Sequence, residues 1–167
     1  MRLFISINFD QPMKDALISV QEQLKEHHIR GNYSKPENLH LTLAFIGEYS
    51  DPDIVLEALS SVVFSPFELS LKGIGSFDTL WWAGLSASDD LKACAAKVRH
   101  CLSSAVIPFD RKKFSPHITL IREPSKPEIP QITIPDVSFT VKEFSLMRSD
   151  RGRRGVIYTE LGSIPAT

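Results

Sequence analysis

The chain contains very little cysteine and no long apolar run. Its 167 residues include only two cysteines, Cys94 and Cys101, within one segment of helical periodicity. Their spacing along a helix puts the two Cα atoms roughly 10 Å apart, beyond the ~7 Å limit for a disulfide. No apolar run approaches the ~20 residues of a membrane span, and residues 1–10 are too short and too polar for a signal peptide. We therefore expect a cytoplasmic protein without a disulfide or a membrane partner.

A strong charge of either sign is also missing. Lys and Arg total 19 against 20 Asp and Glu, for a net charge of −1. This balance argues against electrostatic binding of duplex nucleic acid over an extended positive surface. It leaves room for a small ligand, or for a nucleic-acid end held by a few local basic groups. Gly-x-Gly-x-x-Gly, Walker and Gly-x-Ser-x-Gly motifs are absent as well, so neither a nucleotide-binding α/β fold nor a hydrolase with a serine nucleophile is favoured.

The sequence does contain a regular alternation of strand-like and helical segments, in a chain long enough for one domain. Period-two hydrophobicity predicts strands and 3.6-residue periodicity predicts helices. The expected strands are 3–9, 38–47, 67–72, 80–85, 115–122, 139–147 and 156–161, and the expected helices are 10–28, 50–65 and 88–105. Turn residues separate the strands at 73–78 and 148–155. Frequent hairpins and few crossovers favour antiparallel pairing, so we expect a mixed α/β fold of the α+β type.

Two of these strands carry the same short motif. Residues 39–43 read Leu-His-Leu-Thr-Leu and residues 116–120 read Pro-His-Ile-Thr-Leu. Residues i and i+2 of a strand share a face, so His40 and Thr42 point the same way, as do His117 and Thr119. An imidazole and a hydroxyl at identical spacing, twice in one chain, indicate two halves of one site.

Packing and metal binding are the two simpler explanations. A single histidine in an apolar strand is usually a buried, hydrogen-bonded residue, but packing gives no reason to repeat the pair. A zinc site needs three or four ligands, whereas each motif supplies one histidine. The nearest carboxylates, Glu37, Glu48 and Glu123, flank the ends of the strands. We therefore expect no metal.

Paired acid–base catalysis uses both residue types. A neutral imidazole takes a proton from water while a protonated one gives a proton to a departing oxygen. The hydroxyls of Thr42 and Thr119 are suited to bond the non-bridging oxygens of a phosphoryl group between the histidines. The reaction that fits is in-line opening of a strained cyclic phosphodiester, without metal or cofactor. From the residues alone, the two histidines are interchangeable as acid and base.

These motifs resemble those of the two-histidine (2H) phosphoesterases, and more closely those of the RNA 2′,3′-cyclic phosphodiesterases, also called 2′-5′ RNA ligases. The resemblance extends from Arg2 to Leu161. The matching segments are 2–5, 36–43, 45–48, 80–85 and 116–122. It implies one domain over residues 1–167 with the bilobal 2H phosphoesterase fold, in which two pseudo-symmetric antiparallel sheets with flanking helices surround a central cleft. Each lobe lends one His-x-Thr strand to that cleft.

The resemblance also implies an activity and a role for each motif residue. The enzyme would hydrolyse a terminal 2′,3′-cyclic phosphate of RNA to a 2′-phosphomonoester, with weak 2′-5′ ligation as a lesser activity. His40 would be the proton donor to the leaving 3′ oxygen, and His117 the proton acceptor that activates water. Thr42, Thr119 and Arg122 would bind the phosphate. The expected partner is an RNA end or a related nucleotide, bound by a monomer.

Arg122 fits this role only if the second strand is irregular. It lies five residues after His117, and a regular strand would put it on the opposite face. We therefore expect the strand to end or bulge before Arg122.

Candidate contacts to the terminal base or the RNA chain are Phe4, Phe9, Trp82 and Arg151. Aromatic side chains stack on nucleobases with little sequence preference. The neighbours Trp81 and Trp82 must face opposite ways, so only one of them is expected at the cleft. Arg151 belongs to the densest cluster of arginines in the chain, residues 148–154.

Two alternatives remain for the function. A phosphodiesterase of 2′-5′ oligonucleotides, or of a small cyclic nucleotide, would use the same chemistry on another substrate. A non-catalytic nucleotide- or RNA-binding module would belong to a different class, but a pure binder has no need of a matched acid and base.

Overall fold

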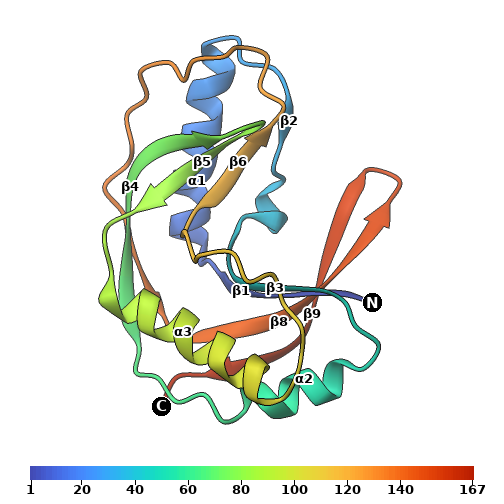
Figure 1. Ribbon diagram of the computed structural model, residues 1–167. Helices are drawn as coiled ribbons and strands as arrows, with labels where there is room; N and C mark the ends of the chain where they lie inside the picture. Colours follow the sequence, from blue (N-terminus) through green and yellow to red (C-terminus); the bar gives the residue numbers. More distant parts are fainter.

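The protein has two lobes, each built on an antiparallel sheet (Figure 1), in a computed structural model that describes all 167 residues. In chain order the elements are β1 (Arg2–Asn8), α1 (Gln11–Glu26), β2 (Asn32–Tyr33), the 3-10 turn η1 (Pro36–Asn38), β3 (His40–Glu48), α2 (Pro52–Leu59), β4 (Phe67–Phe77), β5 (Leu80–Leu85), α3 (Asp89–Ser104), β6 (Ile118–Arg122), β7 (Ser138–Val141), β8 (Glu143–Gly152) and β9 (Gly155–Pro165). The expected α+β class is confirmed.

The two sheets repeat one arrangement. Their strand orders are β3-β1-β8-β9 and β2-β6-β5-β4-β7, so the first sheet matches the second with β2 added at its edge. The His-x-Thr strands β3 and β6 occupy corresponding places. Helices α2 and α3 pack against the first sheet, while α1 lies against the second (Figure 1). A single apolar core of 36 buried residues runs through both lobes, which holds the two sheets around the cleft.

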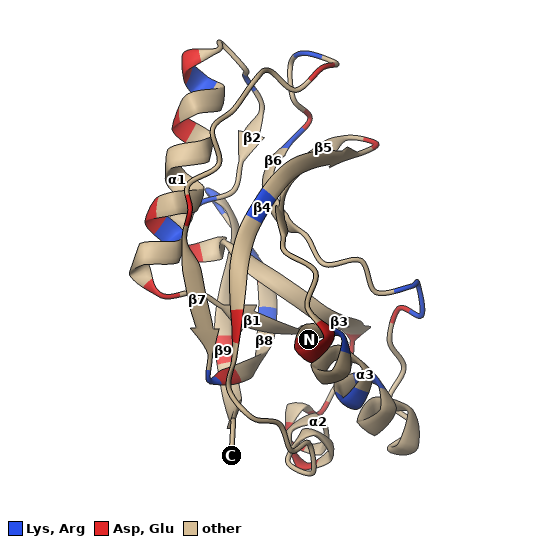
Figure 2. Cartoon of the chain, turned by 90° about the vertical axis from the view of Figure 1, so that its left-hand side faces the viewer, with Lys and Arg blue, Asp and Glu red and all other residues tan.

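The first helix shows why the local sequence specifies its element. The Asp10 side chain caps α1 by accepting a hydrogen bond from the Met13 amide at 3.0 Å, which satisfies an otherwise unpaired N–H. Met13, Leu17 and Leu24 are fully buried at helical spacing, each burial stabilising the fold by about 1.5–3 kcal/mol. The acidic and basic residues of α1 gather toward its two ends (Figure 2), with Lys14 and Asp15 in the first half and Glu22, Lys25 and Glu26 in the last turns. No helix in the fold combines the length and the hydropathy needed to cross a membrane.

The second helix is shorter than predicted. It ends at Leu59 rather than near residue 65. The hydroxyls of Ser60 and Ser61 donate to the carbonyls of Glu57 and Ala58, at 2.6 and 3.0 Å. These hydroxyls thus bond the carbonyl groups of the last helical turn, in place of the main-chain N–H groups that would continue the helix.

Several strand boundaries also differ from prediction. Strand β6 begins at Ile118 rather than at 115, so His117 directly precedes it, and β9 continues to Pro165. Residues 73–77, with two glycines, belong to β4 instead of ending it. A bulge lies between Leu71 and Ile74, and Gly73 adopts the positive φ of +79° there, which glycine permits. The expected strand 139–147 is divided at Lys142, so that β7 joins the second sheet and β8 the first. The arginine-rich segment is a hairpin that projects from the sheet (Figure 1), with only residues 153–154 in its turn.

Both cysteines are free thiols on α3. Burial raises the pKa of the Cys94 thiol to about 11, which keeps it protonated and unreactive near neutral pH.

Candidate active site

The second His-x-Thr strand contains the predicted irregularity. On β6, Thr119 pairs with Trp82 and Ile121 with Trp81, which leaves Leu120 without a partner on β5. This bulge shifts the alternation of side chains by one residue. Arg122 therefore returns to the face of Thr119 and lines the cleft, as the sequence-based hypothesis of a bulge required.

The first motif has a bulge at the same place. On β3, Thr42 pairs with Ser6 and Ala44 with Ile5, so Leu43 has no partner on β1. The residue five positions after this histidine is Phe45, which also lines the cleft. The guanidinium of Arg2 lies 4.8 Å from the centre of its ring. Each motif thus has an arginine beside the residue five positions after its histidine. In the second motif that residue is Arg122 itself, and in the first it is Phe45, on whose ring Arg2 packs.

Both imidazoles are oriented by the same main-chain contact. His40 Nδ1 lies 2.7 Å from the carbonyl of Asn38, and His117 Nδ1 lies 2.8 Å from that of Ser115. A carbonyl only accepts, so Nδ1 carries the proton in each ring. The Nε2 atom is then left for chemistry. His40 Nε2 is 2.9 Å from Thr42 Oγ1, whose hydroxyl donates to it when the ring is neutral.

The two motifs meet at one cavity of about 820 Å³ between the lobes, a size typical of a ligand site. It is lined by both histidines and both threonines of the motifs, and by Arg122. β3 and β6 belong to different sheets, so the histidines approach from opposite sides. A phosphorus atom between them would have one imidazole on each side, as an in-line displacement requires.

The cavity is strongly positive although the chain is not. Among its lining residues are five cationic side chains and one carboxylate. The cations are Arg2, Lys35, Arg122, Arg151 and Arg154. The carboxylate, Asp150, forms an ion pair with Arg148 at 2.8 Å. This concentration of positive charge in a cleft favours a polyanionic ligand.

Burial makes the charged form of His40 less favourable. Its pKa lies below the ordinary imidazole value, chiefly because burial penalises the charged ring. The Asn38 carbonyl opposes this effect, while positive charge at His117 and Arg122 adds to it. His40 is therefore mainly neutral near pH 7 in the free protein. A phosphate anion bound beside His40 would stabilise the charged imidazolium and so raise the pKa of His40.

Aromatic rings support both histidines. Phe4 and Tyr158 lie 5.1 and 5.2 Å from His40, between ring centres, and 4.9 Å from each other. Phe77 meets His117 edge-on at 5.0 Å. These contacts limit the rotation of the imidazoles. Burial raises the pKa of Tyr158, and the charges of Arg122 and Arg2, which line the same cavity, oppose that shift.

The predicted base contacts are only partly placed at the cavity. Arg151 and Phe4 line it, but Phe4 is 4% exposed and offers little free surface to a base. Phe9 is buried in the core, edge-on to Phe139 at 5.5 Å, so the expectation of a base contact there is wrong. Trp81 and Trp82 do face opposite ways. Trp82 is half-buried, packs against Phe77 and does not line the cavity, which corrects its proposed contact too.

Several cavity residues escaped sequence reasoning. Tyr158 and Lys35 lie in no motif that marks them, and Asn38 lies in the matching segment 36–43 without a predicted role. The Asn38 side chain donates to the Val156 carbonyl at 3.1 Å, and Lys35 Nζ donates to the Arg154 carbonyl. The segment before His40 thus holds the β8–β9 hairpin beside the cavity. The only usable signal was the spacing of Tyr158 within a predicted strand.

The histidines are not part of a recognisable metal cluster. No group of three or more His, Cys, Asp or Glu side chains is arranged to hold a metal ion anywhere in the chain. The donor set of the cavity consists of imidazoles, hydroxyls and guanidiniums, which suits an anion.

Comparisons with known proteins agree with this geometry. A model of the 2′-5′ RNA ligase superfamily matches residues 13–153. An Archaeoglobus fulgidus protein named RNA 2′,3′-cyclic phosphodiesterase is 31% identical over 96% of this chain and 98% of its own. A Thermotoga maritima protein of the same name is 30% identical over 96% and 93%. The crystal structure of Escherichia coli LigT complexed with 3′-AMP is similar at a TM-score of 0.88 and 26% identity, covering 99% of this chain and 98% of that one.

Proposed function

Because this chain belongs to the 2′-5′ RNA ligase superfamily, we propose that it is an RNA 2′,3′-cyclic phosphodiesterase, which opens a terminal cyclic phosphate to a 2′-phosphomonoester. Relatives from Archaeoglobus fulgidus and Thermotoga maritima carry that name. The observation that carries the proposal is the convergence of two equivalent His-x-Thr pairs, from opposite lobes, on one positive cavity. A weak 2′-5′ ligation, in which a 5′-hydroxyl takes the place of water as the nucleophile, is a lesser part of the proposal.

The acid and the base act on opposite sides of phosphorus. Nε2 of His117 accepts a proton from water as the water oxygen bonds to phosphorus. The bond from phosphorus to the 3′ oxygen breaks, and Nε2–H of His40 gives its proton to that oxygen. The products are a 2′-phosphomonoester and a free 3′-hydroxyl, with the two histidines left in exchanged protonation states. Proton exchange with solvent resets them.

The remaining cavity residues hold the charge that develops on the phosphate. The hydroxyls of Thr42 and Thr119 donate to its non-bridging oxygens, and the Arg122 guanidinium supplies a planar pair of donors. Thr42 is already bonded to His40 Nε2, so ligand binding exchanges this internal bond for one to phosphate. That exchange frees Nε2 for the leaving oxygen.

Substrate class and setting are extensions of the same proposal. We propose that the partner is single-stranded RNA ending in a cyclic phosphate, bound by a monomeric, one-domain enzyme of the cytoplasm. A small cyclic nucleotide or a 2′-5′ oligonucleotide would use the same residues. The structure of the E. coli relative with 3′-AMP supports a nucleotide as the occupant of the cavity. A module that only binds would need no oriented Nε2 pair.

The decisive experiment uses a short RNA ending in a 2′,3′-cyclic phosphate, incubated with catalytic amounts of protein in excess EDTA. We expect multiple turnovers and 2′-phosphate as the main product, because the proposed acid and base are both side chains. Products are separated against 2′- and 3′-phosphate standards. Activity that disappears with EDTA and returns with a divalent metal would contradict the metal-free mechanism. No turnover under either condition, with tight RNA binding, would favour the binding module.

The arginines of the β8–β9 hairpin predict an effect of substrate length. Replacing Arg151 by alanine should weaken binding of an oligonucleotide, because Arg151 lines the cavity beyond the catalytic residues. The slope of log KM against log salt should decrease by about 0.7 for each phosphate that the protein no longer neutralises. A mononucleotide 2′,3′-cyclic phosphate should show no such change. Arg153→Ala is the matched control, since Arg153 lies in the turn of the same hairpin and does not line the cavity. If the slope of log KM against log salt is the same for Arg151→Ala and Arg153→Ala, Arg151 does not contact the RNA phosphates.

A further inference from the structure

One buried polar side chain has no place in the mechanism described so far. Gln21, on α1, is only 4% exposed. A buried amide is costly unless its hydrogen bonds are made, and an apolar residue would fit the buried stripe of α1 at lower cost. Its location therefore indicates a purpose other than stabilising the helix.

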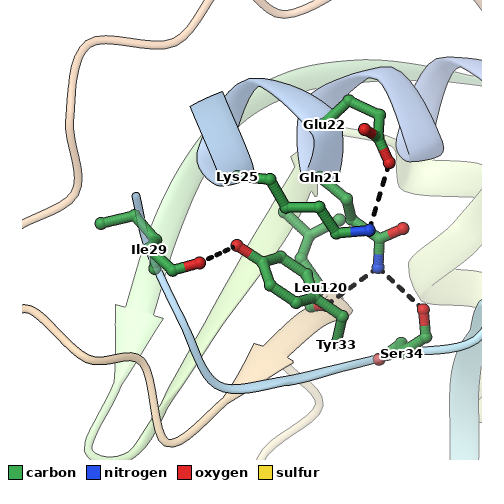
Figure 3. Close-up of polar contacts among 7 residues, drawn as sticks. All are labelled: Gln21, Glu22, Lys25, Ile29, Tyr33, Ser34 and Leu120. Carbon is green, nitrogen blue, oxygen red and sulfur yellow. Dashed lines mark hydrogen bonds and ion pairs between the residues drawn. The ribbon is translucent and has the colours of Figure 1, made fainter. Parts of the chain in front are cut away.

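The Gln21 amide is bonded to the backbone of the second motif strand. Gln21 Nε2 donates to the carbonyl of Leu120 and to that of Ser34, at 2.9 Å each (Figure 3). Leu120 is the bulged residue of β6. Ser34 adds two contacts to the same stretch, from its amide to the Leu120 carbonyl at 3.0 Å and from its hydroxyl to the Thr119 carbonyl at 2.8 Å. The bulge is thus held on its outer edge by Gln21 and Ser34.

The first motif strand is held in the same way by an unrelated residue. Arg99, on α3, donates from Nε to the carbonyl of Leu43 at 3.1 Å, and Leu43 is the bulged residue of β3. In each lobe, the helix that packs on the sheet sends one polar side chain to the bulge carbonyl. Since the two donors differ in type, their shared feature is the position of the bond.

We propose that Gln21 is a positioning residue for the reaction: by holding the bulge at Leu120, it turns Arg122 into the cavity. The inference rests on the proposed function and deepens it. Without the bulge, Arg122 would fall on the opposite face of β6 from Thr119. Gln21 touches no substrate, and it acts only through the course of the strand between Thr119 and Arg122.

The test is a double-mutant cycle on cyclic-phosphate hydrolysis. Gln21→Met keeps the volume of the side chain and removes both of its donated bonds. We expect kcat/KM to fall by about 10-fold to 10²-fold, because displacement of a catalytic contact by about 1 Å has that cost. In an Arg122→Ala background the effect of Gln21→Met should disappear, because Gln21 acts through Arg122. A change in kcat/KM of less than about twofold is within the usual scatter of such cycles. The ratio of the kcat effect to the KM effect should match that of Arg122→Ala.

The controls separate positioning from folding. Gln23→Met is the matched variant, since Gln23 is on the same helix and pairs with the backbone of Thr133, away from the cavity; it should leave kcat/KM unchanged. Gln21→Leu also removes both donated bonds and serves as a second starting variant for the cycle should Gln21→Met unfold, whereas Ser34 lines the cavity and is left unchanged. Equal losses from either Gln21 variant with and without Arg122 would overturn the proposal. Inactivity of the wild-type protein would instead refute the proposed function.

Discussion

Replacing either motif histidine by alanine is expected to lower kcat for cyclic-phosphate hydrolysis by about 10²–10⁴-fold, the usual contribution of a general acid or base. His40 and His117 are the two imidazoles whose Nδ1–H is fixed by a main-chain carbonyl and whose Nε2 is available to the cavity. Loss of the acid leaves the 3′ oxygen to depart as an alkoxide, and loss of the base leaves neutral water as the nucleophile. Single-turnover kinetics on a cyclic-phosphate RNA measure both effects.

The matched control is His100→Ala, which removes an exposed histidine of α3. It should leave kcat unchanged, and thermal unfolding should show that all three variants are folded. A loss of less than about tenfold in either motif variant would mean that the histidine binds rather than transfers a proton.

The assignment of His40 as the acid has a consequence for pH dependence. Its pKa is lowered by burial in the free protein, and an acid works only while it is protonated. The rate constant kcat/KM should therefore decrease as pH rises through that lowered pKa, which gives an optimum on the acidic side. A phosphate anion bound beside His40 should raise its pKa, so we expect the corresponding decrease in kcat at higher pH. The decrease should disappear in His40→Ala and persist in a variant of His117; the opposite result would exchange the roles.

Arg122→Ala is expected to lower kcat/KM by about 10²–10³-fold, comparable to the loss of one donor from an oxyanion site. Arg122 lines the cavity and acts electrostatically on both His40 and Tyr158. Its removal withdraws positive charge from the place where the phosphate gains charge in the transition state. Steady-state kinetics over a range of RNA concentrations separate the effects on kcat and KM.

Arg122→Lys should recover only part of this loss, because an ammonium keeps the charge but cannot supply the planar pair of donors. Arg111→Ala is the control, since Arg111 is exposed and packs on the ring of Phe109. Full activity of Arg122→Ala would show that the bulge places the arginine in the cavity without a role in the reaction, and would also remove the basis for the positioning of Arg122 by Gln21.

Much of the site was visible in the sequence because it depends on neighbours along the chain. Residues two apart in a strand share a face, so the pairs His40 with Thr42 and His117 with Thr119 could be placed without a structure. The same alternation groups Phe4 with Ser6 and Asn8 on one face, and Phe9 with the buried Leu3, Ile5 and Ile7 on the other. The expectation of a base contact at Phe9 went against this pattern, and the structure corrected it.

What lies outside the motifs could not be predicted in this way. Tyr158 on β9, Arg2 on β1 and Lys35, between β2 and η1, reach the cavity from separate parts of the chain, and no local spacing relates them. The position of the arginine-rich hairpin depends on two bonds from the segment before His40. The division of residues 138–152 between two sheets likewise depends on which strand edges are free, which periodicity does not reveal.

Residue type and short-range alternation were thus enough to establish the α+β class, the two motif strands, and the chemistry of an imidazole and a hydroxyl in each. The shared cavity and the place of Arg122 in it were expectations from the motifs and the family resemblance, which only the folded chain could decide. The lowered pKa of His40 had no signal in the sequence. The physical reason is that burial, electric field and the register of a bulged strand are set by contacts between residues far apart in the chain. Gln21 and Leu120, 99 positions apart, are one such contact.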